Sequence, residues 1–111
     1  MSAKYVRISA SNTNADKRGD YLFFDLRMKD GKVSDRLPIF GLQVDHKERM
    51  PFFVGADGRA DYGVTYPEKD RYMTTDLFRI EIVPLSIITV ASHDFSDTYL
   101  IDWVKEIDDL F

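Results

Sequence analysis

Apolar side chains recur at every second position in several segments of this chain, and that spacing limits the folds open to it. The segment "KYVRIS" places Val6 and Ile8 on one side. The segment "DYLFFDLRM" alternates in the same way, with Leu22, Phe24, Leu26 and Met28 on one side and Tyr21, Phe23, Asp25 and Arg27 on the other. A period of two is typical of a β-strand with one face on a hydrophobic core. The chain is therefore predicted to be mainly β.

Three further segments have the character of strands. "LFRIEIV", residues 77–83, alternates Phe78, Ile80 and Ile82 with polar side chains. "LSIITVA" is apolar on both sides and rich in β-branched residues, as expected of a central strand. In "RLPIFGL", Pro38 has no N–H to donate, which places this run at a sheet edge or a bulge.

Turn residues separate these runs. Asp30-Gly31 and Asp57-Gly58 are strong hairpin signals, because glycine supplies the positive φ that tight turns require. The polar segments "ASNTNADKRG" and "TYPEKDRYMTTD" are predicted to be loops.

The C-terminal segment has a different spacing. Apolar residues recur at helical intervals, at Leu100, Trp103, Val104, Ile107, Leu110 and Phe111, and polar residues occupy the opposite face, at Asp102, Lys105, Glu106, Asp108 and Asp109. This pattern favours an amphipathic helix with Ser96 or Asp97 as its N-cap. A strand through Tyr99, Ile101 and Trp103 is the alternative, because "TYLI" and "WV" are rich in strand-forming residues.

These elements predict a mainly β, α+β fold. The expected architecture is an antiparallel sheet or small barrel of about six or seven strands with a C-terminal helix, and the alternative is an all-β barrel or sandwich. The 111 residues show no change in composition along the chain, so residues 1–111 are expected to form one domain.

Composition excludes several classes of protein. The chain has no Cys, which rules out a disulfide scaffold, a thiolate metal site and a Cys nucleophile. Its net charge of −4 disfavours general binding to nucleic acid, because the phosphate backbone calls for a basic surface. No signal peptide or membrane-spanning apolar run is evident, so a soluble cytoplasmic protein without membrane contact is expected.

The segment Ser92–Asp97, "SHDFSD", contains the residue types of a catalytic triad. Neighbours in an extended segment point to opposite faces, however, and no glycine elbow surrounds either Ser. His46 and His93, the only two His, fit no metal-binding motif. We therefore assign no catalytic residue, metal or cofactor, and the protein is expected to be a non-enzyme.

Aromatic and cationic side chains alternate on one face of the first two strands. If these strands pair, Tyr5, Arg7, Tyr21, Phe23 and Arg27 lie together, either exposed as a binding surface or covered by the C-terminal helix. The first functional hypothesis is a non-catalytic binding domain, such as an adaptor, inhibitor or immunity-type protein, with a protein partner. The alternatives are an oligonucleotide-binding domain that recognises single-stranded nucleic acid and a small enzyme or ligand-binding barrel that uses His46 or His93. A homo-oligomer is compatible with each of them.

Overall fold

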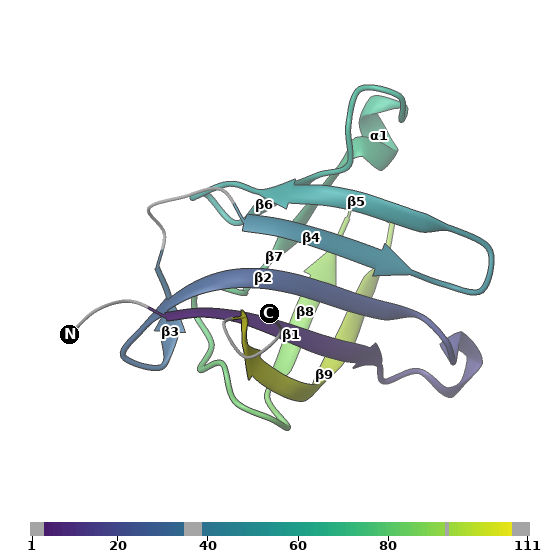
Figure 1. The fold of residues 1–111 in the computed structure, drawn as a ribbon. Helices are drawn as coiled ribbons and strands as arrows, with labels where there is room; N and C mark the ends of the chain where they lie inside the picture. The colour runs from purple at the N-terminus through teal and green to yellow at the C-terminus, as the bar shows by residue number, and fades with distance from the viewer. Residues whose placement is uncertain (1–3, 35–38, 93, 108–111) are drawn as a thin grey trace.

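The computed structural model describes residues 4–34, 39–92 and 94–107, which form a closed antiparallel β-barrel with one additional strand (Figure 1). The strands are β1 (Lys4–Asn12), β2 (Tyr21–Lys29), β3 (Lys32–Val33), β4 (Ile39–Val44), β5 (Arg49–Val54), β6 (Arg59–Asp61), β7 (Tyr72–Thr75), β8 (Ile87–Ala91) and β9 (Ser96–Glu106). Helical elements in this part of the chain are the single turns η1 (Ala15–Lys17) and α1 (Glu68–Arg71).

Eight strands close the barrel in the order β1-β2-β4-β5-β6-β7-β8-β9, and β9 pairs with β1 to complete the circle. The short β3 pairs with the end of β2 and lies outside this circle. The β1–β2 and β4–β5 connections lie at the same end of the barrel, on the right in Figure 1. We refer to this end as the mouth of the barrel.

The alternation in the sequence places the core inside the barrel. Ile8, Leu22, Phe24 and Leu26 are at most 1% exposed, and they point inward together with residues from β5, β8 and β9. The interior is filled so closely that a Cβ atom on Gly41 would overlap the ring of Phe52, which is itself buried. Because side chains fill the inside of the closed barrel, the sheet needs no helix packed against it to complete the core.

The predicted C-terminal helix is wrong, because residues 96–106 form the longest strand, β9. The pairing of β9 with β1 shifts between Ser9 and Ala10, which face Trp103 and Ile101, so that Asp102 is an extra residue. Such a bulge moves the inward positions from Ile101 to Val104. Inward side chains at this point are therefore three residues apart, which is the spacing expected of a helix. Residues 108–111 of the predicted helix lie outside the described part of the chain.

The number of strands was also underestimated, since the described residues form nine strands rather than six or seven. The all-β barrel given as the alternative is the observed fold. The predicted strand over residues 77–83 is wrong: these residues form a turn followed by irregular backbone, although Leu77 and Ile82 are buried in the core. The predicted loop over residues 65–76 contains both α1 and β7.

The predicted hairpin turns are confirmed. Asp30 and Gly31 have φ values of 56° and 81° between β2 and β3, and Gly58, with φ of 78°, lies between β5 and β6. Pro38 lies outside the described residues. None of the helical segments in the described part of the chain has the length and apolar character needed to cross a membrane.

Candidate functional site

The five residues proposed as a binding face lie on the outside of the barrel. The strands β1 and β2 pair in a register that sets Tyr5 opposite Arg27, Arg7 opposite Asp25 and Ser9 opposite Phe23. Tyr5 and Tyr21 are 51% and 39% exposed, respectively. The helix expected to cover this face is the strand β9, which instead extends the wall beside β1.

Sequence analysis missed the greater part of this surface, which neighbouring strands supply. Phe40 and Leu42 of β4 lie opposite Asp25 and Phe23, Phe53 of β5 lies opposite Phe40, and Trp103 of β9 lies opposite Ser9. We call this surface the outer aromatic face and define it by Tyr21, Phe23, Phe40, Leu42, Phe53 and Trp103. The alternation in "IFGL" and "FFV" was the signal that could have identified its β4 and β5 members.

The rings of the outer aromatic face form two groups of neighbours. The Phe23 ring centre lies 6.5 Å from those of both Tyr21 and Trp103, and the rings of Phe40 and Phe53 meet edge to face at 5.7 Å. Ser9 is only 4% exposed, although it is on an outward position between Phe23 and Trp103. The aromatic side chains therefore form a second apolar layer on the outside of the wall.

A groove of about 400 Å³ runs through this face, lined by Arg7, Phe23, Asp25, Phe40, Leu42 and Trp103. The two charged residues neutralise each other, because Arg7 Nε and Nη2 donate to Asp25 Oδ1 and Oδ2 at 2.6 and 3.0 Å. The hydrogen bonds to Asp25 raise the pKa of Arg7 above its usual value. The groove is thus apolar with a neutral ion pair in its lining.

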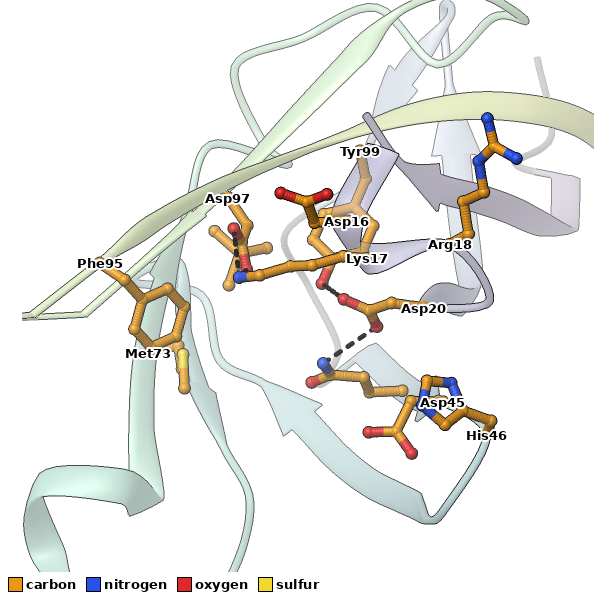
Figure 2. Close-up of a pocket in the computed structure, with 12 residues that line it drawn as sticks. Asp16, Lys17, Arg18, Asp20, Asp45, His46, Met73, Phe95, Asp97 and Tyr99 are labelled. Atoms are coloured by element: carbon orange, nitrogen blue, oxygen red, sulfur yellow. Dashed lines mark hydrogen bonds and ion pairs between the residues drawn. The ribbon is translucent and has the colours of Figure 1, made fainter. Parts of the chain in front are cut away.

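A second cavity, of about 340 Å³, occupies the mouth of the barrel (Figure 2). Its lining comes from the β1–β2 loop, β4 and the loop after it, β7, β8, the β8–β9 connection and the start of β9. The lining residues are Asp16, Lys17, Arg18, Asp20, Gln43, Asp45, His46, Met73, Val90, Phe95, Asp97 and Tyr99. Unlike the groove, this cavity combines carboxylates with apolar side chains. We call it the mouth cavity.

A hydrogen-bonded network holds Asp20 in the mouth cavity. The Tyr99 hydroxyl and Asn12 Nδ2 donate to Asp20 Oδ2 at 2.6 and 3.0 Å, and Gln43 Nε2 donates to Oδ1 at 3.2 Å. Gln43 Oε1 in turn accepts a hydrogen bond from the Tyr62 hydroxyl at 2.9 Å. The Asp20 carboxylate of the β1–β2 loop therefore joins three strands, β1, β4 and β9, and Gln43 extends the network to Tyr62 after β6.

The two tyrosines in this network are held in the protonated state. Burial raises the pKa of Tyr99 well above its usual range, and the hydrogen bond and negative charge of Asp20 add to this effect. Burial likewise raises the pKa of Tyr62. Raised tyrosine pKa values keep both hydroxyls as hydrogen-bond donors rather than as bases, so the network fits binding better than proton transfer.

An ion pair links the two sides of the mouth. Lys17 Nζ from η1 lies 2.9 Å from both carboxylate oxygens of Asp97 at the start of β9. The same ammonium lies 5.7 Å from the centre of the Phe95 ring. Figure 2 shows the Lys17 side chain extended across the cavity towards Asp97.

The "SHDFSD" segment is the connection between β8 and β9. The Ser92 N–H donates to the Phe95 carbonyl at 2.9 Å, and the Ser92 hydroxyl accepts from the Asp94 N–H at 3.3 Å, which is local loop bonding. Ser96 and Asp97 begin β9 and do not cap a helix. His93 lies outside the described residues, and His46 is in the lining of the mouth cavity.

Over residues 4–34, 39–92 and 94–107, no three His, Cys, Asp or Glu side chains are grouped so that they could hold a metal ion. The function of the chain must be inferred from the outer aromatic face and the mouth cavity, because no family model, no curated protein and no solved structure matches it.

Proposed function

We propose that the protein is a small non-catalytic domain that binds another protein through the outer aromatic face. The observation that carries the proposal is the extent of this face, whose six members come from β9, β2, β4 and β5 and lie on both sides of one groove, from Trp103 on β9 to Phe53 on β5. Phe40 and Phe53 are 42% and 56% exposed. A large continuous apolar patch is rare on a surface that contacts only water, and aromatic residues are enriched where proteins bind each other.

The groove defines the chemistry of the partner. Its walls are the rings of Phe23, Phe40 and Trp103, and its ion pair carries no net charge. An apolar side chain presented by the partner would therefore fill the groove, while the Arg7–Asp25 pair could exchange hydrogen bonds with the partner's backbone. A buried apolar anchor surrounded by polar contacts is the usual arrangement of an interface hot spot.

Single-stranded nucleic acid is the second candidate. Phe23 lines the same groove as Arg7, Tyr21 lies next to Phe23 on the same face, and such a face can stack bases. Two features favour a protein instead. Arg7 is already paired with Asp25, and the chain as a whole carries a charge of −4. Phosphate binding depends on cations that are free to replace counterions.

The test compares the wild-type protein with a Phe40→Ala, Phe53→Ala double variant in affinity capture from native extract. We expect the double variant to retain a specific partner at least tenfold less well, because exposed aromatic anchors contribute about 2 kcal/mol or more at interfaces. The matched control is Val64→Ala, which shortens a side chain that is 80% exposed between β6 and α1.

Equal recovery of the same partner proteins by the wild type and both variants would show that the outer aromatic face is not the binding surface. Titration with a single-stranded oligonucleotide, followed by Trp103 fluorescence, separates the two candidates. Quenching that weakens steeply as salt is raised would favour nucleic acid. Sedimentation of the purified protein identifies the remaining case, in which a second copy of the chain occupies the face.

A further inference from the structure

The mouth cavity is separate from the outer aromatic face and has a different chemistry. Met73, Val90 and Phe95 supply an apolar side, and Asp20, Gln43 and Asp45 supply polar groups. In Figure 2, Phe95 and Met73 lie together on one side of the cavity, and Asp45 and His46 lie on the other. A cavity with an apolar wall and a few convergent polar groups is the usual form of a small-molecule site.

The protein already places one primary ammonium in this cavity. Lys17 Nζ is bound by both oxygens of Asp97, whose side chain is only 14% exposed, and lies over the Phe95 ring. The carboxylate and the ring together form the environment that alkylammonium groups prefer. The lining therefore recognises an ammonium that the chain itself supplies from the β1–β2 loop.

Asp20 offers a second acceptor for such a group. Its Oδ2 accepts two hydrogen bonds, from Tyr99 and Asn12, whereas its Oδ1 accepts one, from Gln43. A carboxylate has about four acceptor positions, so one position on Oδ1 remains. All three donors are neutral, and no cation is bonded to Asp20 within the described ranges.

The charge of the lining selects the sign of the ligand. Four carboxylates, Asp16, Asp20, Asp45 and Asp97, face two permanent cations, Lys17 and Arg18. Lys17 is paired with Asp97, and the Arg18 guanidinium points away from the other side chains in Figure 2. An anionic ligand would be repelled by this lining, and a cationic ligand would be attracted.

We propose that the mouth cavity binds a small organic primary ammonium with an apolar body. The ammonium donates a hydrogen bond to Asp20 Oδ1, and the apolar body lies against Phe95, Met73 and Val90. Because Tyr99, Asn12 and Gln43 hold the Asp20 carboxylate in place, the site is formed before the ligand arrives. A preformed site loses little affinity to the ordering of its own side chains.

Three probes of the same length test the charge requirement: hexylammonium, 1-hexanol and hexanoate. We expect amide chemical shifts in the ¹H–¹⁵N NMR spectrum to change at Gly19, Asp20 and Phe95 when hexylammonium is added. Hexylammonium should bind about tenfold more tightly than 1-hexanol, because hydrogen bonds between charged groups are the stronger kind, and hexanoate should not bind. Equal binding of the three probes would overturn the proposal, as would shifts confined to the outer aromatic face or no saturable shift with hexylammonium.

Two variants test the two halves of the site. Asp20→Asn keeps the shape of the side chain but removes its charge, and should abolish the preference for hexylammonium over 1-hexanol. Phe95→Ala removes an aromatic ring that is 42% exposed, and it should weaken the binding of hexylammonium and of 1-hexanol by a similar factor. Val64→Ala should bind both as the wild type does. If Asp20→Asn does not fold, the probe series and Phe95→Ala decide the question, and unchanged affinities in Phe95→Ala would count against the site.

Discussion

Phe23 and Phe24 are neighbours in β2 and lie on opposite sides of the barrel wall. Phe24 is 1% exposed and meets Phe52 edge to face, with ring centres 5.5 Å apart. Phe23 lies on the outside between Tyr21 and Trp103. The pair Phe52 and Phe53 in β5 repeats the arrangement, with 3% of Phe52 and 56% of Phe53 exposed.

The difference separates aromatic residues that the fold requires from those that it does not. A closed barrel needs bulky apolar side chains on its inner face, and there the rings complete a packed core. The outer face of a barrel in water needs no aromatic residue. The rings of Phe24 and Phe52 are explained by stability of the core, whereas core packing does not account for the rings of Phe23 and Phe53, on which the proposed binding face rests.

Phe24→Ala tests the inner side of this comparison and should have the largest effect. We expect a loss of about 3–5 kcal/mol in the free energy of unfolding, because a fully buried aromatic side chain leaves a cavity that the barrel cannot close. Urea unfolding followed by Trp103 fluorescence measures the change. A loss below about 1 kcal/mol would show that the interior is not packed around this ring.

Tyr99→Phe examines an inner aromatic residue whose tip reaches the mouth cavity. At neutral pH we expect the free energy of unfolding to fall by about 1 kcal/mol, because Asp20 loses one hydrogen-bond donor. At alkaline pH the difference in stability between the wild-type protein and Tyr99→Phe should become smaller. The pKa of Tyr99 is raised on folding, so above about pH 10 the unfolded chain loses this proton while the folded protein keeps it.

The stability that Tyr99 contributes is therefore complete below about pH 10 and declines as the pH rises above it. Urea unfolding at pH 7 and at pH 11 provides the comparison. The wild-type protein should lose more stability between these two pH values than Tyr99→Phe does. Identical losses in the two proteins would mean that Tyr99 titrates normally and is not held by Asp20.

The inner face was largely predictable from the sequence because alternation is a local property. Of the six residues placed on the inner side of the first two strands, Val6, Ile8, Leu22, Phe24 and Leu26 are buried, and Met28 is partly buried against the core. The prediction for the C-terminal segment was wrong because of one residue. The extra residue Asp102 changes the interval between inward side chains from two to three, and only the pairing with β1 reveals it.

The two candidate sites depend on contacts that no short segment encodes. Residues Phe23, Phe40 and Trp103 come together because β4 and β9 flank the β1–β2 pair, an order set by closure of the barrel. The mouth cavity joins Lys17 to Asp97, 80 residues apart in the sequence. No motif in the sequence marks Asp20, and its role in the network depends on Tyr99, 79 residues away.

Phe53→Ala tests the outer side of the comparison and should have the smallest effect on stability. Its ring is more than half exposed, and its aromatic neighbour is Phe40. We expect the free energy of unfolding to change by no more than about 0.5 kcal/mol, as is usual for surface substitutions. The adjacent residue Phe52 points the other way, into the core. A loss above about 2 kcal/mol, measured by urea unfolding, would mean that the outer rings stabilise the barrel wall. Their presence would then be explained by folding, and the argument for a binding face would lose its main support.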